Sequence, residues 1–232
     1  MDKLPNCIGF IMDGNRRFAK EAGLPTLEGH RRGGQVMIES MRYFSKAKIP
    51  HLVYFAFSTE NWNRNEDEVS YLMKLFGEYL EEIKKEIKSK AKENSSFRIR
   101  FIGRREDFDT ELQFKMNELE LIGEAYDKNS TTVWIALSYG GRAEIIEAVN
   151  VAVGGGRAVT EASFEKLLWT AELPEVDMIV RTGGEKRLSN FLTWRSVYSE
   201  LYFIEKHWPS LTEADFKDIL NEYAKRERRH GR

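Results

Sequence analysis

The sequence predicts an α/β protein that forms a single domain over residues 1–232, with a mainly parallel sheet covered by helices. Five short apolar runs alternate along the chain with segments whose apolar residues recur at helical spacing, and this β-α-β-α order is typical of parallel sheets. Most of the runs are almost continuously apolar, which indicates strands buried on both faces. The chain has no linker long enough to define a second domain.

The predicted strands are short and lie between segments of helical pattern. In chain order they are Cys7–Met12, His51–Phe57, Phe97–Ile102, Thr132–Ser138 and Met178–Arg181. The run Phe97–Ile102 differs from the others because apolar and basic residues alternate along it.

The predicted helices follow from apolar residues three or four positions apart. In chain order they are Gln35–Ala47, Val69–Ile87 with a solvated continuation over Glu81–Glu93, Glu106–Glu124, Ala143–Val153, Ser163–Trp169 and Glu213–Arg226. The chain has five prolines, and each lies at a predicted boundary, where the missing backbone N–H does no harm.

Composition excludes several classes of protein. Hydrophobic residues make up 41% of the chain, which excludes global disorder. The net charge of −1 shows no basic excess, so we expect no nucleic-acid partner. The single cysteine, Cys7, excludes an intramolecular disulfide and a cysteine-based metal cluster. The chain shows neither a secretory leader nor an apolar run of about 18 residues, so we expect a cytoplasmic protein.

The first candidate motif lies where the first predicted strand ends. Asp13 and Gly14 are followed by a predicted helix with Arg16 and Arg17 in its first turn. Ligands of open α/β sheets bind outside the carboxyl ends of the strands, and helix N-termini bind anions. Arginines oppose the helix dipole there unless a phosphate lies between them. The motif therefore predicts a phosphate site with a divalent cation on Asp13, and the alternative is a capped surface helix with solvated arginines.

A phosphohydrolase is a rival interpretation of the same motif. Phosphatases with an aspartyl nucleophile also begin with an acid at a strand end, but they usually need a second acid two residues later. That position is Asn15 here, so a Mg-dependent phosphohydrolase is disfavoured.

A second polar motif follows the strand that ends at Phe57. Ser58, Asn61, Trp62 and Arg64 crowd into one loop. The alternative is an ordinary turn between a strand and a helix in which serine and asparagine act as caps.

The third motif spans residues 181–190, and we expect it to lie between a strand and a helix. Two glycines separate basic residues, so Arg181 and Arg187 can act as bidentate donors to an anion, with Ser189 as a hydroxyl donor or helix cap. The spacing is not that of a P-loop, and the alternative is a plain basic turn. Two anion cradles indicate two phosphorylated substrates and a cation, for which Asp13 and a second acid such as Glu200 could supply ligands.

At these residues the chain resembles the cis-prenyltransferases, the family of undecaprenyl diphosphate synthase and dehydrodolichyl diphosphate synthase. The resemblance covers Ile8 to Gly231. It rests on the motifs 12–17 (MDGNRR), 29–30 (GH), 57–62 (FSTENW), 139–142 (YGGR), 181–185 (RTGGE) with Arg187 and Ser189, and 200–203 (ELYF).

The resemblance implies an activity and an architecture. Family members condense an allylic diphosphate such as farnesyl or geranylgeranyl diphosphate with isopentenyl diphosphate, adding five-carbon units with new Z double bonds. The product is a polyprenyl diphosphate such as undecaprenyl diphosphate, a lipid carrier precursor. Members use Mg2+ and form a homodimer of six-stranded parallel sheets covered by helices, with the product in an apolar tunnel. Peripheral contact with a membrane for product release would follow.

The resemblance also implies roles for the motif residues. Asp13 assists departure of the metal-bound diphosphate, and Glu200 helps to bind the metal. The residues implied to hold the allylic diphosphate are Gly14, Arg16, Arg17 and Arg64, and those implied to hold isopentenyl diphosphate are Arg181, Arg187 and Ser189. The residues implied to arrange the reacting ends are Asn15, Ser58, Asn61 and Trp62.

Other matched positions carry alternatives or departures. His30 is a diphosphate contact by resemblance and a helix cap otherwise, and Arg229 reaches across the dimer interface or belongs to a solvated basic tail. Phe18 stands where tryptophan is common and keeps an aromatic face, so the resemblance implies that it takes part in substrate binding. Thr26 stands where an arginine often binds diphosphate, which puts the affinity for the allylic substrate in question.

The long helix matching Val69–Ile87 is implied to line the tunnel. We expect Leu72, Phe76 and Leu80 to alternate between lining the tunnel and packing on the sheet. A non-catalytic family member that binds lipid diphosphates is the remaining alternative, and the presence of Asp13 and Arg181 speaks against it.

Overall fold

The computed structural model describes residues 4–90, 97–124, 130–156 and 158–226. Its strands are β1 Cys7–Ile11, β2 His51–Ser58, β3 Phe97–Ile102, β4 Thr131–Tyr139, β5 Met178–Arg181 and β6 Glu200–Phe203. Its α-helices are α1 Asn15–Glu21, α2 Thr26–Lys46, α3 Glu66–Lys90, α4 Thr110–Glu124, α5 Gly141–Gly154, α6 Glu161–Glu165 and α7 Glu213–Ala224. Short 3-10 turns cover Thr59–Asn63, Arg105–Asp107 and Trp208–Ser210.

The strands form one six-stranded sheet in the order β3-β4-β2-β1-β5-β6, and every neighbouring pair is parallel. The predicted fold class and the five predicted strands are confirmed, and the sixth strand is β6. All residues of β1 and β4 are buried, as their continuous apolar sequences predict. The alternating strand β3 lies at one edge of the sheet.

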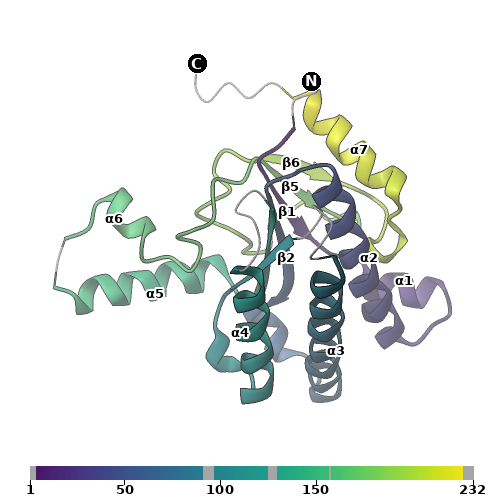
Figure 1. The fold of residues 1–232 in the computed structure, drawn as a ribbon, viewed down its shortest axis with the longest axis horizontal. Coiled ribbons are helices and arrows are strands. Elements are labelled where there is room, and N and C mark those ends of the chain that lie inside the picture. Colours follow the sequence, from purple (N-terminus) through teal and green to yellow (C-terminus); the bar gives the residue numbers. More distant parts are fainter. Residues whose placement is uncertain (1–3, 91–96, 125–129, 157, 227–232) are drawn as a thin grey trace.

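The two faces of the sheet are covered differently. The larger core packs the sheet against α2, α3, α4 and α7, which Figure 1 shows on one side of the strands. The smaller core on the other face is closed by the segment around Leu173, Phe191 and Leu192, which contains no helix. The prediction of a helix after residues 181–190 is wrong, because this segment turns repeatedly instead.

Helix α2 begins at Thr26 rather than at the predicted Gln35. Three glycines, Gly29, Gly33 and Gly34, weaken the helical pattern because glycine costs about 1 kcal/mol relative to alanine in a helix. In the structure a Cβ atom at Gly29 would overlap the backbone of Asn15, and one at Gly33 would overlap its side chain. Gly29 and Gly33 therefore let α2 pack directly against Asn15, the first residue of α1.

Two other predicted helices end or begin elsewhere. The helix predicted over Ser163–Trp169 is only α6, which ends at Glu165. The chain then turns so that the Thr170 N–H donates to the buried carboxylate of Glu144 at 2.8 Å. Helix α4 begins at Thr110, after a 3-10 turn, rather than at the predicted Glu106.

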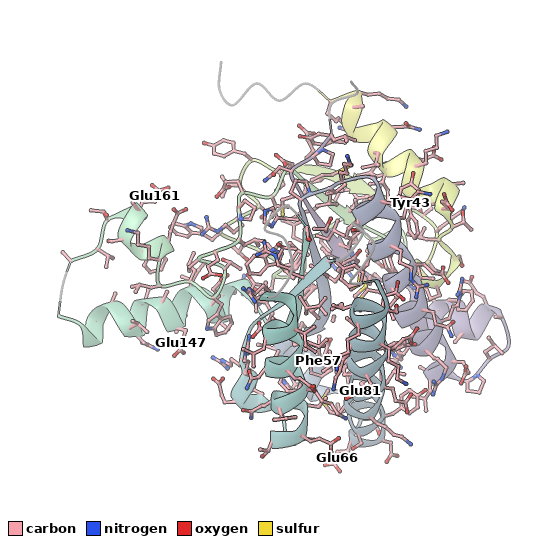
Figure 2. The ribbon with its side chains drawn as sticks, viewed as in Figure 1. Tyr43, Phe57, Glu66, Glu81, Glu147 and Glu161 are labelled. Carbon is pink, nitrogen blue, oxygen red and sulfur yellow. The ribbon has the colours of Figure 1, made fainter. Side chains whose placement is uncertain are left out.

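Helices α5 and α6 form an arm that extends away from the sheet (Figure 1), with Glu147 and Glu161 labelled on it in Figure 2. A small apolar cluster around Ala148, Phe164 and Leu168 holds the arm together. The arm also exposes Ile146, Val151 and Val153. Among the described residues, no helix has the length and apolarity needed to cross a membrane.

Candidate active site

The predicted motifs meet at the carboxyl ends of β1, β2 and β5. Strand β1 pairs with β2 on one side and with β5 on the other, so the chain changes direction across the sheet at β1. A polar pocket with a cavity volume of about 560 Å³ opens there. The predicted site residues that line this polar pocket are Asp13, Asn15, His30, Ser58, Asn61, Arg64, Arg181 and Ser189.

Asp13 is held at the wall of the pocket by contacts to both its side chain and its backbone. Its Oδ2 accepts a hydrogen bond from Arg181 Nη2 at 2.9 Å, and its Oδ1 accepts one from the Gly14 N–H at 2.7 Å. Its backbone oxygen accepts from Thr182 Oγ1 at 2.7 Å and from the Trp208 N–H at 3.0 Å. Burial opposes ionisation of the carboxyl, but these donors and the charges of Arg181 and Arg17 lower the pKa of Asp13 overall, so it is an anion at neutral pH.

Arg181 links the first and third motifs. Its side chain is 4% exposed, and Nη1 donates to the Arg187 backbone oxygen at 2.6 Å and to Ser189 Oγ at 2.7 Å. Ser189 and Asn190 have φ angles of 49° and 65°, in the left-handed region that non-glycine residues seldom adopt. Such backbone strain persists only where the surrounding contacts over-determine it, and these contacts turn the chain away from a helix.

Arg17 lies beside the third motif. Its Nη1 donates to the Gly183 backbone oxygen at 2.6 Å, and its Nη2 is 3.3 Å from Asp13 Oδ1. Arg187 is 59% exposed, and its guanidinium pairs with Glu185. The first helix and the Gly183–Gly184 turn are thus joined through Arg17.

A second cationic cluster gathers around Glu68, near the start of α3. The Glu68 carboxylate accepts from Arg64 Nη1 at 3.2 Å and lies 3.3 Å from His30 Nε2 and 4.0 Å from Arg16 Nη1. Burial and the charge of Arg64 lower the pKa of His30, against the opposing effect of Glu68, so this imidazole is neutral at neutral pH. Sequence reasoning missed Glu68, although its spacing of four residues from Arg64 is a recognisable helical ion-pair signal.

The second motif contributes Ser58, Asn61 and Arg64 to the lining of the pocket, whereas Trp62 packs outside that lining. The Ser58 N–H donates to Asn61 Oδ1 at 3.1 Å, which closes the turn after β2. The Trp62 indole is not among the pocket-lining groups: its Nε1 donates to Ser138 Oγ at 2.8 Å, and its ring packs against Phe57 and Phe108.

Three polar residues that line the pocket were missed by the sequence interpretation: Glu60, Arg142 and Asn190. Asn190 Nδ2 donates to Glu60 Oε1 at 2.9 Å, and Asn190 Oδ1 accepts from the Arg142 N–H at 2.8 Å. Each of these three residues lies within or directly after a motif that the sequence analysis singled out. The hydrogen bonds between the motifs, however, cannot be predicted from the neighbouring sequence.

Several predicted site residues lie elsewhere. Phe18 is half-buried on α1 and does not line the polar pocket, and Thr26, the departure from the family pattern, begins α2 outside that pocket. Glu200 is the first residue of β6 and pairs with Met178, the first residue of β5. Asp13 follows Ile11, which pairs with Arg181, the last residue of β5. Within one chain Glu200 therefore lies at the opposite end of the strands from Asp13. Its carboxylate lies 3.7 Å from Arg226. Arg229 lies outside the described residues.

The arrangement of carboxylates shows what kind of metal site the pocket could form. No group of three histidine, cysteine, aspartate or glutamate side chains able to hold an ion occurs in the described ranges. Mg2+, however, is usually held by one or two carboxylates together with substrate phosphates rather than by an all-protein cage. A single ionised Asp13 at the wall of a pocket lined by arginines fits that arrangement.

An apolar pocket adjoins the polar one and lies between α2, α3 and the sheet. Its volume is about 80 Å³, and the two pockets share Met12, Asn15, His30, Ala56 and Leu72. The predicted tunnel residues Leu72, Phe76 and Leu80 all line it, and the Phe76 ring also packs against Phe57 of β2.

Comparison with known proteins agrees with this geometry. The family model described as putative undecaprenyl diphosphate synthase matches residues 11–231. An isoprenyl transferase of Thermotoga maritima is 41% identical over 234 residues, covering 99% of this chain and 97% of the relative. An isoprenyl transferase of Aquifex pyrophilus is 40% identical over 231 residues, covering 99% and 97%.

Two crystal structures have the same fold. Lavandulyl diphosphate synthase from Lavandula x intermedia, solved in complex with dimethylallyl diphosphate, superposes with a TM-score of 0.91 at 31% identity over 99% of each chain. A probable undecaprenyl diphosphate synthase from Campylobacter jejuni superposes with a TM-score of 0.80 at 32% identity over the whole of both chains. The chain is therefore a prenyltransferase that belongs to the undecaprenyl diphosphate synthase family.

Proposed function

We propose that this enzyme condenses isopentenyl diphosphate with an allylic diphosphate, farnesyl or geranylgeranyl diphosphate, and adds five-carbon units with Z double bonds. The product is a polyprenyl diphosphate such as undecaprenyl diphosphate. The observation that carries the proposal is the shared wall of the two pockets. A molecule with a charged diphosphate head and a hydrocarbon tail fits a polar pocket that continues into an apolar one.

The cationic side chains in and beside the polar pocket suit two diphosphates. Arg181, Ser189 and Arg187 form the cradle that we assign to isopentenyl diphosphate. His30, Arg64 and Arg16, gathered on Glu68, form the cradle that we assign to the allylic diphosphate. Binding a trianionic head against arginines is favourable because charge-assisted hydrogen bonds are about twice as strong as neutral ones.

The proposed reaction exchanges one bond for another. The allylic carbon–oxygen bond breaks and diphosphate leaves, a carbon–carbon bond forms to the isopentenyl double bond, and a proton leaves the isopentenyl unit. Asn15 supports this placement, because its Oδ1 is buried at the wall common to both pockets with no partner among the described residues. We assign Asn15, Ser58 and Asn61 to orienting the reacting ends, and Trp62 to supporting their loop.

We propose Mg2+ as the cofactor, held by Asp13 and substrate phosphate oxygens. When bound, the ion neutralises charge on the leaving diphosphate. Asp13 holds its place through its backbone bonds to Thr182 and Trp208, which are independent of any metal.

The proposal is tested by incubating the enzyme with radiolabelled isopentenyl diphosphate, Mg2+ and geranyl, farnesyl or geranylgeranyl diphosphate. We expect chain-elongated products, sized by chromatography, that disappear on addition of EDTA. Release of inorganic phosphate without any elongated product would instead support the phosphohydrolase.

We also propose that the enzyme works as a homodimer in the cytoplasm, with peripheral membrane contact for release of its apolar product. The α5–α6 arm supports a dimer, because it exposes the apolar side chains of Ile146, Val151 and Val153. Arg229 is proposed to reach the partner. Sedimentation equilibrium should give twice the 27.0 kDa chain mass, and Val153→Glu should reduce it to one chain. A wild-type monomer with full activity would contradict the dimer.

A further inference from the structure

The two groups of residues that isopentenyl diphosphate would contact belong to strands that are not neighbours in the sheet. The cradle assigned to its diphosphate lies at the end of β5 and in the loop after it, with Arg181 and Ser189. The groups assigned to the reacting ends include Ser58 and Asn61, at the end of β2 and in the turn after it. Strand β1 lies between β2 and β5, so no backbone ladder joins these two strands directly. The distance between the cradle and the reacting ends therefore depends on contacts between loops.

Asn190 makes those contacts. Its Nδ2 donates to Glu60 Oε1 at 2.9 Å, and among the described residues this is the one direct hydrogen bond between residues 57–64 and residues 181–190. Its Oδ1 accepts from the Arg142 N–H at 2.8 Å, and its backbone oxygen accepts from the Gly141 N–H at 2.7 Å. The loops that follow β2, β4 and β5 are thus joined at one residue.

The surroundings of Asn190 hold its side chain in place. Its φ of 65° lies in the left-handed region, in which asparagine is enriched among non-glycine residues. A Cβ atom at Gly140 would lie 2.8 Å from Asn190 Nδ2 and 2.7 Å from Thr59 Oγ1, so the amide packs directly against the backbone before α5. The next residue, Phe191, is fully buried and stacks on Phe55 of β2, with ring centroids 4.7 Å apart.

The charge of Glu60 strengthens this bridge. Burial opposes ionisation of the carboxyl, but the hydrogen bond from Asn190 and those from neighbouring groups lower the pKa of Glu60 overall, so it is an anion at neutral pH. A hydrogen bond to a carboxylate is about twice as strong as a neutral one. The second oxygen, Oε2, accepts from Thr59 Oγ1 at 3.2 Å. Both oxygens of Glu60 are therefore occupied by donors of the protein itself.

We propose that Asn190, by bridging Glu60 and the start of α5, is a positioning residue that fixes the isopentenyl cradle relative to the second motif. This inference rests on the proposed condensation reaction and on the assignment of the cradle to isopentenyl diphosphate. A displacement of about 1 Å between reacting atoms can cost up to about 10²-fold in rate. A loop that holds the diphosphate at the wrong distance from the reacting ends would therefore impair use of this substrate and leave the allylic substrate bound as before.

The test begins with Asn190→Asp. This variant keeps the size of the side chain, the oxygen that accepts from the Arg142 N–H and the tolerance of a left-handed φ. It replaces the donor to Glu60 with a second carboxylate oxygen, which repels the first. We expect kcat/KM for isopentenyl diphosphate to fall about 10-fold or more, the size expected from loss of a hydrogen bond to a charged group. The KM for the allylic diphosphate should not change.

A donor–acceptor exchange separates the bridge from a general structural effect. Glu60→Gln alone keeps an oxygen that accepts from Asn190, so kcat/KM should stay close to the wild type. Asn190→Asp combined with Glu60→Gln reverses the bond, because the glutamine amide then donates to the carboxylate. This pair should recover kcat/KM, a non-additive result expected only of residues in contact. The matched control combines Asn190→Asp with Glu60→Ala, which has the same net charge but no donor, and should stay impaired.

The outcomes separate the inference from the function on which it rests. A wild-type enzyme that elongates nothing contradicts the proposed function. Elongation with an unchanged kcat/KM in a folded Asn190→Asp enzyme overturns the role of Asn190, and so does equal recovery by the alanine combination or no recovery by the glutamine combination. Circular dichroism melting reports folding. If Asn190→Asp does not fold, Gly140→Ala carries the same expectation, because its methyl group displaces the Asn190 amide.

Discussion

Asp13→Ala is expected to lower kcat by about 10²-fold or more, the effect of losing charge stabilisation at a leaving group. Asp13 is the ionised carboxylate beside Arg181 and Arg17 at the wall of the polar pocket. The variant should still fold, because the chain at residue 13 is held by backbone bonds to Thr182 and Trp208. The measurement is steady-state turnover at saturating Mg2+ and both substrates.

A matched variant separates charge from shape at this position. Asp13→Asn keeps the size of the side chain and an oxygen that can accept from the Gly14 N–H, but it removes the negative charge. We expect it to lose nearly as much turnover as Asp13→Ala, with an unchanged circular dichroism spectrum. Near wild-type kcat in either variant would refute the assignment of Asp13 to the leaving diphosphate.

Arg181→Ala is expected to damage both stability and substrate binding. The guanidinium is 4% exposed and joins Asp13, Ser189 and the Arg187 backbone in one network. Removing one partner of a buried ion pair costs roughly 3 kcal/mol or more, and we expect the lower end because Asp13 is partly exposed. Urea denaturation measures the loss in the free energy of unfolding, and kinetics should show a raised KM for isopentenyl diphosphate.

Arg187→Ala is the matched control for the same cradle. This side chain is 59% exposed and pairs only with Glu185 among the described residues, so the free energy of unfolding should hardly change. Losing one charged donor typically costs about 1.5–3 kcal/mol of substrate binding, so the KM for isopentenyl diphosphate should rise roughly 10- to 100-fold. A rise in the KM for the allylic substrate instead would mean that the two cradles are exchanged.

Strand positions and motif positions were predictable from the sequence because both are local signals. A run such as Thr132–Ser138 is apolar throughout because its strand is buried on both faces, and the structure buries every residue of β4. Parallel strands bring their carboxyl ends to one edge, so residues just after Ile11 and Phe57 had to lie near one another. That reasoning located Asp13 and Ser58 at the pocket.

The interactions between these motifs could not be read from the sequence. Arg181 lies 168 positions from Asp13 in the sequence, and the residues around each of them give no signal that predicts the hydrogen bond between them. The same holds for Trp62, whose indole donates a hydrogen bond to Ser138, 76 positions away, and does not line the polar pocket. Glu200 was grouped with Asp13 by chemistry, yet the register of β6 places it at the far end of the strands.

By itself, the sequence determined the fold class, the strands and the edge of the sheet that carries the chemistry. Both signals are local: strands buried on two faces are continuously apolar, and polar residues follow directly where the strands end. Only the tertiary structure decided the start of α2, the irregular chain after Arg181 and the packing of the Tyr79 ring against Gly34. Gly29, Gly33 and Gly34 oppose a helix when α2 is considered alone. They suit it once another backbone or ring approaches, because close packing repays their local cost.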